Sequence, residues 1–408
     1  MKNKRKMLTI VSTLLIIILV TISLMYFNTQ ENNTEIKSSL KEYNAKLEEN
    51  ENMHLEEDSS GDKIPVPNGY VGSKADGENE IDTGYVIYEG TEEVNNENVE
   101  EAQKARNQYV WIPVPDASKM YGTDEKGKKW GKLYDFTTDT GDNIDPITGT
   151  KPLNWSISDG IMKIISKVNQ KSNREPDIVT NIDNTVYDMN SRLKNYGLGI
   201  KSTHEFLMQL EKEFDDMIES IKKYGGFYIG RYETGNLSQE VAVVKKGNTD
   251  ISNQTWYSMY EKCKKLKGNI STIETSMIWG SQFDRTLMWL IESENKSKEE
   301  ICEDSTSWGN YSNAEFTYIN VNGNITTKHG ATKIPTGSTE YTKANNIYDL
   351  AGNVWDWTIE GVDTFNRVVR GGYNYDKGTL YTANARHDYG YPANRSINNG
   401  CRAMLYIK

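Results

Sequence analysis

The sequence contains little cysteine or histidine and has no excess of positive charge. Its three cysteines, Cys263, Cys302 and Cys401, are odd in number and widely separated. They therefore exclude a disulfide framework and a thiolate zinc site, although one bridge remains open. The net charge of -11 argues against a nucleic-acid partner, because phosphate binding requires a cationic face.

Aromatic residues, by contrast, are abundant for a polar chain. The sequence carries nine Trp and 25 Tyr with an overall hydrophobic fraction of 36%. Disordered chains are poor in such side chains, which bury large apolar surfaces and also make good contact surfaces. The composition therefore predicts a folded, tyrosine-rich domain.

The N-terminal region predicts a membrane anchor. Residues 1–6 are basic, and residues 7–27 are uncharged and rich in Leu, Ile, Val and Met. A helix of that length spans the hydrocarbon core of a bilayer, and the basic flank stays in the cytoplasm. We expect an uncleaved signal anchor in preference to a cleaved signal peptide, because no small-residue cleavage site follows. The expected product is a single-pass cell-membrane protein with an extracytoplasmic C-terminal part.

The remainder divides into a linker and one large domain. Residues 28–62 are rich in Glu, Asn, Ser and Lys, which predicts an acidic disordered stalk. From residue 63 to 408, strand-like runs (84–88, 108–114 and 226–233) alternate with helical patterns at 202–224, 253–267 and 276–292. The polar stretch 118–198 predicts surface loops. We expect an α+β fold with long loops.

Three motifs in the C-terminal half resemble the formylglycine-generating enzyme, or sulfatase-modifying factor, family. They are NIYDLAGNVWDW at 346–357, RVVRGG at 367–372, and GCR at 400–402, and FYIGRYE lies upstream. The similarity is loose over 63–408 and close over 347–402. It implies a C-type-lectin-like α+β fold. Trp355 and Trp357, two residues apart, predict a core anchor, and Gly371-Gly372 predicts a positive φ or a close backbone approach.

The resemblance also implies a calcium site in this region. Carried over to this sequence, its ligands are the carboxylates of Asp349 and Asp356 and the carbonyl groups of Gly352 and Val354. Calcium takes six to eight oxygen ligands, which such a loop can supply. The alternative is that the two aspartates cap turns.

The catalytic residues of the family are missing. Members that make formylglycine use two cysteines after the Arg-Gly-Gly stretch to bind copper, and no cysteine lies between Gly372 and Gly400. A sister branch uses a three-histidine iron site, whereas the four histidines here are scattered. Copper or iron is therefore not expected, and the protein is more simply a binder than an enzyme. The alternative is an oxidoreductase of the same family with altered metal ligands.

The segment 373–399 has the composition of a binding surface. Tyrosine offers a large contact area at low entropic cost, and short polar side chains form adaptable hydrogen bonds. The alternative is the general richness of this chain in Tyr and Asn. The function expected is binding of an extracellular protein or glycan. The candidate ligand-binding residues are Tyr373, Tyr375, Tyr381, Asn384, His387, Tyr389, Tyr391 and Asn394.

Overall fold

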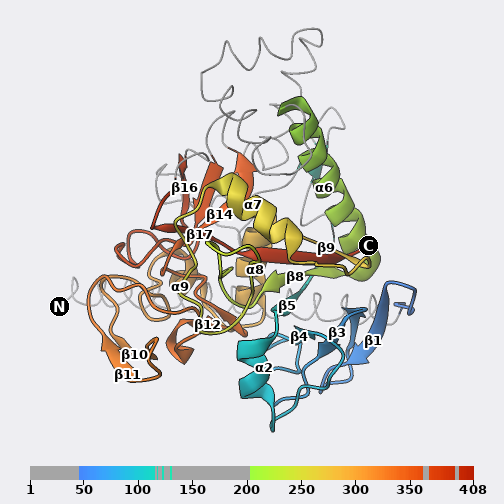
Figure 1. The fold of residues 1–408 in the computed structure, drawn as a ribbon, viewed down its shortest axis with the longest axis horizontal. Helices are drawn as coiled ribbons and strands as arrows, with labels where there is room; N and C mark the ends of the chain where they lie inside the picture. The colour runs from blue at the N-terminus through green and yellow to red at the C-terminus, as the bar shows by residue number, and fades with distance from the viewer. Residues whose placement is uncertain are drawn as a thin grey trace, which may run out of the picture.

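The computed structural model describes residues 46–114, 117, 122–123, 129–130, 203–361, 367–390 and 395–408. In these residues strands β1 to β18 greatly outnumber the helices (Figure 1). The predicted α+β class is therefore wrong, because the described part is mostly β with few helices. Most strands have two to five residues, too short for a clear alternating pattern, whereas the few helices gave strong periodic signals.

The largest sheet has six strands, and every neighbouring pair in it is antiparallel. Their order across the sheet differs from their order in the chain, so the last strand of the protein lies inside the sheet. In spatial order the strands are β3 (Tyr70–Gly72), β4 (Val86–Glu89), β5 (Gln108–Pro113), β8 (Gly226–Gly230), β18 (Ala403–Ile407) and β9 (Ile273–Met277).

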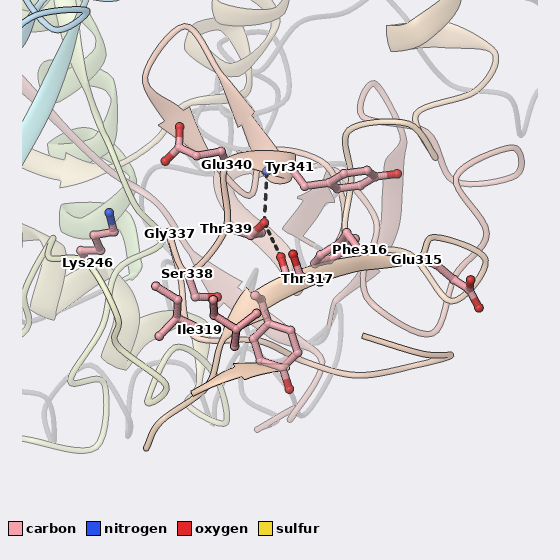
Figure 2. Close-up of a pocket in the computed structure, with 12 residues that line it drawn as sticks. Lys246, Glu315, Phe316, Thr317, Ile319, Gly337, Ser338, Thr339, Glu340 and Tyr341 are labelled. Carbon is pink, nitrogen blue, oxygen red and sulfur yellow. Dashed lines mark hydrogen bonds between the residues drawn. The ribbon is translucent and has the colours of Figure 1, made fainter. Parts of the chain in front are cut away.

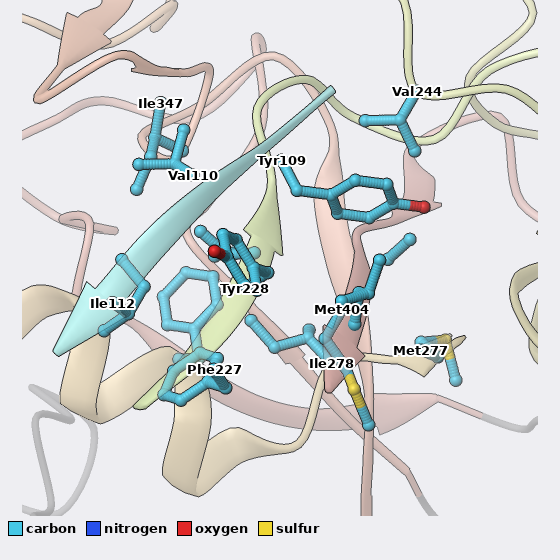
Figure 3. Packing of buried hydrophobic residues seen from close by; sticks show 14 of the residues in the cluster. Tyr109, Val110, Ile112, Phe227, Tyr228, Val244, Met277, Ile278, Ile347 and Met404 are labelled. Atoms are coloured by element: carbon cyan, nitrogen blue, oxygen red, sulfur yellow. The ribbon is translucent and has the colours of Figure 1, made fainter. Parts of the chain in front are cut away.

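The central strands β5, β8 and β18 are buried along their whole length. Both faces of these strands are covered, which explains their continuous apolar runs in place of alternation. Figure 3 shows side chains from these strands, among them Tyr109, Phe227 and Met404, packed with Ile278 and Ile347 from neighbouring segments. The predicted strands at 84–88, 108–114 and 226–233 are confirmed within a few residues.

Three helices cover this sheet and the sheet beside it. Helix α6 (Thr203–Tyr224) contacts β8 and β18, α7 (Trp256–Lys265) contacts β9, and α8 (Gly280–Glu292) contacts β5 and β14. The side chain of Thr255 caps α7 by accepting from the backbone N–H of Ser258. All three predicted helices exist, but α8 starts four residues later than expected, because Ser276 belongs to β9.

A second sheet contains the predicted signature motifs. Its strand order is β16 (Arg386–Gly390), β15 (Arg367–Arg370), β14 (Trp355–Gly361) and β17 (Asn399–Cys401), with β14 and β17 parallel. Arg402 alone separates β17 from β18, so the chain passes directly from this sheet into the larger one. Trp355 and Trp357 are both buried, which confirms the predicted core anchor.

The remaining elements are short. Among the hairpins, β1 pairs with β2 inside a segment whose first part was predicted to be a disordered stalk. The stalk boundary at residue 62 is thus corrected, because Met53 is buried in the core. The short elements are β1 (Met53–Glu57), β2 (Lys63–Pro67), α2 (Val99–Ala105), β6 (Gly122–Thr123), β7 (Lys129–Trp130), α9 (Lys298–Cys302), β10 (Phe316–Ile319), β11 (Ile325–Lys328), η2 (Glu340–Thr342), β12 (Lys343–Ala344) and β13 (Ile347–Tyr348).

The predicted membrane topology is also corrected. Within the described ranges, no helix has both the length and the apolar character that crossing a bilayer requires. The longest, α6, has 22 residues, but charged side chains recur along it. The single-pass topology and the cell-membrane localisation are contradicted by this finding and are not retained. The segments on which they were based, 1–6 and 7–27, lie outside the described residues.

The turn after β15 requires glycine. Gly371 has a φ of +87°, and a Cβ added there would lie 2.6 Å from the carbonyl oxygen of Leu350. Gly61, in the β1–β2 turn, has a nearly identical φ of +83° with nothing within 4 Å. Both glycines have the same strained backbone conformation, but only Gly371 has a close neighbour. Comparing the two positions therefore distinguishes the cost of backbone strain from the cost of a steric clash.

We expect Gly371→Ala to lower the free energy of unfolding by about 2–4 kcal/mol, the sum of left-handed strain and overpacking. Gly61→Ala should cost only about 1 kcal/mol, because it incurs the strain alone. Urea unfolding followed by tryptophan fluorescence measures both. Equal losses in the two variants would show that the close approach to Leu350 does not constrain the turn.

Candidate functional site

Five aromatic rings from three segments of the chain meet at one end of the second sheet. Trp355 begins β14, His387 lies in β16, and Tyr373, Tyr375 and Tyr381 lie on the connection between β15 and β16. These five residues are called the aromatic cluster below. Four of them, all except Trp355, belong to the predicted ligand-binding set.

Trp355 is the centre of the aromatic cluster. Its ring centroid lies 6.4 Å from that of Tyr373, 5.6 Å from that of Tyr381 and 5.8 Å from that of His387. Tyr375 extends the arrangement by stacking on Tyr373 at 5.7 Å. Such offset and edge-to-face pairs stabilise one another and hold the rings in place.

The cluster runs from the core to the surface. Trp355 is 7% exposed, Tyr373 and Tyr381 are half-buried, and Tyr375 is 63% exposed. The exposed Tyr375 ring is supported by the half-buried Tyr373, which in turn packs on the buried Trp355, so the stack presents an ordered aromatic face to solvent. Binding to such a face costs little side-chain entropy, since the rings are already ordered.

Buried groups fix the turn that carries the tyrosines. The Tyr311 hydroxyl donates to the Gly371 carbonyl at 2.8 Å. Beside it, the guanidinium of Arg370 pairs with Asp284 of α8 at 2.6 Å, with both side chains almost completely buried. A buried charge requires such a partner, so the pair ties β15 to α8.

A carboxylate lies next to the rings. Asp376 accepts a hydrogen bond from the backbone N–H of Tyr373 at 3.2 Å. Burial of this side chain raises its pKa to about 7, while that N–H opposes the shift. Asp376 therefore changes charge near neutral pH at the edge of the aromatic cluster.

Among the other predicted ligand-binding residues, Asn384 is the one whose side chain belongs to the described part of the chain. Asn384 is buried, and its side-chain oxygen accepts from the Thr382 hydroxyl, so its role is structural. Tyr389 lies in β16, but its side chain is outside the described part. Tyr391 and Asn394 lie outside the described residues altogether.

A group of acidic side chains is buried near the junction of the two sheets. Glu233, Asp349 and Asp356 are each at most 1% exposed, and they are called the acid cluster below. Arg402 faces them, with its Nε 3.1 Å from Oδ2 of Asp356, and the Lys333 ammonium lies within electrostatic reach of Glu233. Glu233 accepts from the Asn353 amide at 2.7 Å, while its Oε1 and Oδ1 of Asp356 have no hydrogen-bond partner among the described residues.

The predicted calcium ligands lie in and beside the acid cluster. Asp349 already accepts from the hydroxyls of Thr336 and Thr342 and from the backbone N–H of Gly337. Gly352 and Val354 are buried on the same segment. In the part of the chain that the structure describes, no three His, Cys, Asp or Glu side chains are close enough to hold a metal together. The oxygen of this set that lacks a partner is Oδ1 of Asp356.

The three carboxyl groups of the acid cluster repel one another when all are ionised, because they are buried and outnumber the cations beside them. Burial raises the pKa of Glu233 well above its usual range, and the charges of Asp349 and Asp356 raise it further. Burial likewise raises the pKa of Asp356 to about 6, against the opposing effect of Arg402. A bound proton or a cation would relieve this repulsion.

Sequence reasoning missed Glu233 and Arg402. Both lie in stretches that carried the family resemblance, FYIGRYE and GCR, but no role was assigned to either. The available signal was position, since Arg402 directly adjoins two buried strands and Glu233 follows the buried strand β8 by three residues. A charge at such a place requires a buried partner.

The acid cluster predicts an unusual effect of pH on Glu233→Gln. Burial raises the folded-state pKa of Glu233 above its unfolded value, so the contribution of this carboxyl to stability is fully present near pH 4 and is lost as the pH rises through the folded pKa. We expect the variant to match the parent near pH 4 and to be more stable at pH 7, by about 1–3 kcal/mol. Urea unfolding at both pH values measures the difference.

Glu240→Gln is the matched control, because it makes the same substitution at an exposed glutamate outside the acid cluster. It should show the same small effect at both pH values. A Glu233→Gln variant that is less stable than the parent at pH 7 would mean that the ionised carboxylate is satisfied, for example by a bound cation.

Comparison with known proteins adds little to this geometry. No protein-family model matches the chain. No curated protein matches it either. Among solved structures, Treponema denticola variable protein 1 is similar at 15% identity with a TM-score of 0.28, over 45% of this chain and 85% of that one. The resemblance to the sulfatase-modifying factor family stays a prediction.

Proposed function

We propose that this protein binds a protein or glycan ligand through the aromatic cluster and does not transform it chemically. The observation that carries the proposal is the graded stack of three rings, in which the exposed Tyr375 rests on the half-buried Tyr373 and Tyr373 rests on the buried Trp355. Tyrosine and tryptophan supply much of the binding energy at recognition surfaces, because rigid rings bury a large area.

Polar groups beside the rings complete the surface in this proposal. Asp376 and His387 can exchange hydrogen bonds with a ligand, while Leu380, more than half exposed, extends the apolar area. Flat sugar faces and apolar protein side chains both pack well on aromatic rings. The two ligand classes therefore share the chemistry of this site.

A loss-of-binding experiment tests the proposal. The purified protein is applied to an array of defined glycans and to a random peptide library displayed on phage, and binders are measured by calorimetry. We expect Tyr375→Ala to weaken a recovered binder about tenfold or more, as for a buried aromatic contact. Val241→Ala, which removes an exposed apolar side chain outside both the aromatic cluster and the cavity described below, should leave that affinity unchanged.

Two results would contradict the proposal. One is that neither the array nor the library yields a binder, or that binders tolerate Tyr375→Ala. The other is stoichiometric copper or iron in the purified protein together with oxygen uptake in the presence of a cysteine-containing peptide. That second result would favour the alternative, an oxidoreductase with altered metal ligands.

We also propose that calcium stabilises the folded domain by binding to Asp349, Gly352, Val354 and Asp356. Support comes from the excess of buried carboxylate and from the partnerless Oδ1 of Asp356. Calorimetric titration of the chelator-treated protein should show heat at millimolar calcium and a higher melting temperature, with magnesium much weaker because of its stricter geometry. The absence of heat at millimolar calcium would remove this part of the proposal.

A further inference from the structure

A separate cavity opens on the β10–β11 hairpin, away from the aromatic cluster. It has a volume of about 660 Å³ and lies between this hairpin and the segment 337–341, with Lys246 at its edge (Figure 2). Ligand pockets commonly fall in this size range. In Figure 1 the hairpin lies well apart from β14 and β16, so the cavity is distinct from the proposed binding surface.

One side of the cavity is apolar. Phe316 stacks on Tyr341 with ring centroids 4.4 Å apart, and both belong to a small hydrophobic cluster separate from the main core. Ile319 and Ile325 line the same cavity and are 49% and 78% exposed. Large apolar side chains exposed around a concavity are typical of a site that a ligand covers.

The other end is polar and carries one cation. Lys246 and Glu340 lie at this end, with Ser338 between them and the apolar wall (Figure 2). The Lys246 ammonium donates to Oε1 of Gln103 at 2.9 Å and has no carboxylate within ion-pair distance in the described ranges. Glu340, in contrast, is occupied by the Lys343 ammonium and the Tyr348 hydroxyl.

Ser338 adds an unsatisfied hydrogen-bonding group at the same end of the cavity. Its side chain is 7% exposed, and its hydroxyl has no hydrogen-bond partner among the described residues. A buried hydroxyl without a partner is costly, and a ligand acceptor would satisfy it. The Lys246 ammonium and the Ser338 hydroxyl can therefore both donate hydrogen bonds to an acceptor at this end of the cavity.

We propose that this cavity binds a small organic monoanion, a carboxylate carried on an apolar body. The carboxylate accepts from Lys246 and Ser338, and the body packs on Phe316, Ile319 and Ile325. A monoanion fits better than a phosphate dianion, because the single ammonium balances one charge and the nearby Glu340 repels a second. The inference is independent of the aromatic cluster.

Calorimetry with 3-phenylpropionate and its neutral analogue 3-phenylpropanamide tests the charge requirement. The acid should bind, and the amide should bind about tenfold more weakly. Lys246→Gln should remove this preference by weakening the acid about tenfold. Lys245→Gln changes the neighbouring lysine, which does not line the cavity, and should leave acid binding unchanged.

A second pair of variants locates the apolar body. Ile325→Asn should weaken the acid and the amide alike, whereas Val321→Asn, an exposed apolar side chain on the same hairpin but outside the lining, should affect neither. Circular dichroism checks that all four variants are folded. The proposal is overturned by equal affinity for acid and amide, by Lys246→Gln binding like the parent, by insensitivity to Ile325→Asn, or by no binding of the acid.

Discussion

The guanidinium of Arg402 is the contact on which the arrangement of the two sheets depends. It is fully buried and reaches three elements at once: Nε donates to Asp356 of β14, Nη1 to the Gly230 carbonyl of β8, and Nη2 to the Tyr348 carbonyl of β13. Arg402 itself lies between β17 and β18. A buried charge that donates from each of its three nitrogens fixes its partners in one geometry, and removal of one partner costs about 3–5 kcal/mol.

The aromatic cluster and the acid cluster both depend on this contact. Asp356 is one residue from Trp355, so the ion pair that holds β14 also orients the buried ring of the aromatic cluster. Asp349 and Glu233 also lie within electrostatic reach of the same guanidinium, which favours the charged form of both carboxyl groups. The surface that we propose for binding is thus an extension of the most constrained part of the core.

Local patterns predicted the local features and not the long-range ones. The one-sided apolar faces of α6, α7 and α8 were visible in the sequence, and so were the buried run of β5 and the glycine turn after β15. The strands β1 and β9 were missed. Strand β1 has a polar sequence, and β9 ends just before α8, so its residues were assigned to the helical pattern that follows.

The candidate site was predicted in part for the same reason. Tyrosine content identified Tyr373, Tyr375, Tyr381 and His387, but not the Trp355 ring that gathers them, because that contact joins different strands. Composition also placed Asn384 at the surface, whereas Thr382 and the Arg370 contact to its carbonyl turn it inward. Which residues share a buried site is set by sheet order, which no local pattern encodes.

Native-state hydrogen exchange of an Arg402→Lys variant tests the central role of this contact most directly. Lysine keeps the charge but cannot donate in three fixed directions. The account predicts that amide protection falls together in β8 and β14, strands of two different sheets, while β1 and β2 keep theirs. Loss of protection confined to β17 and β18 would contradict it.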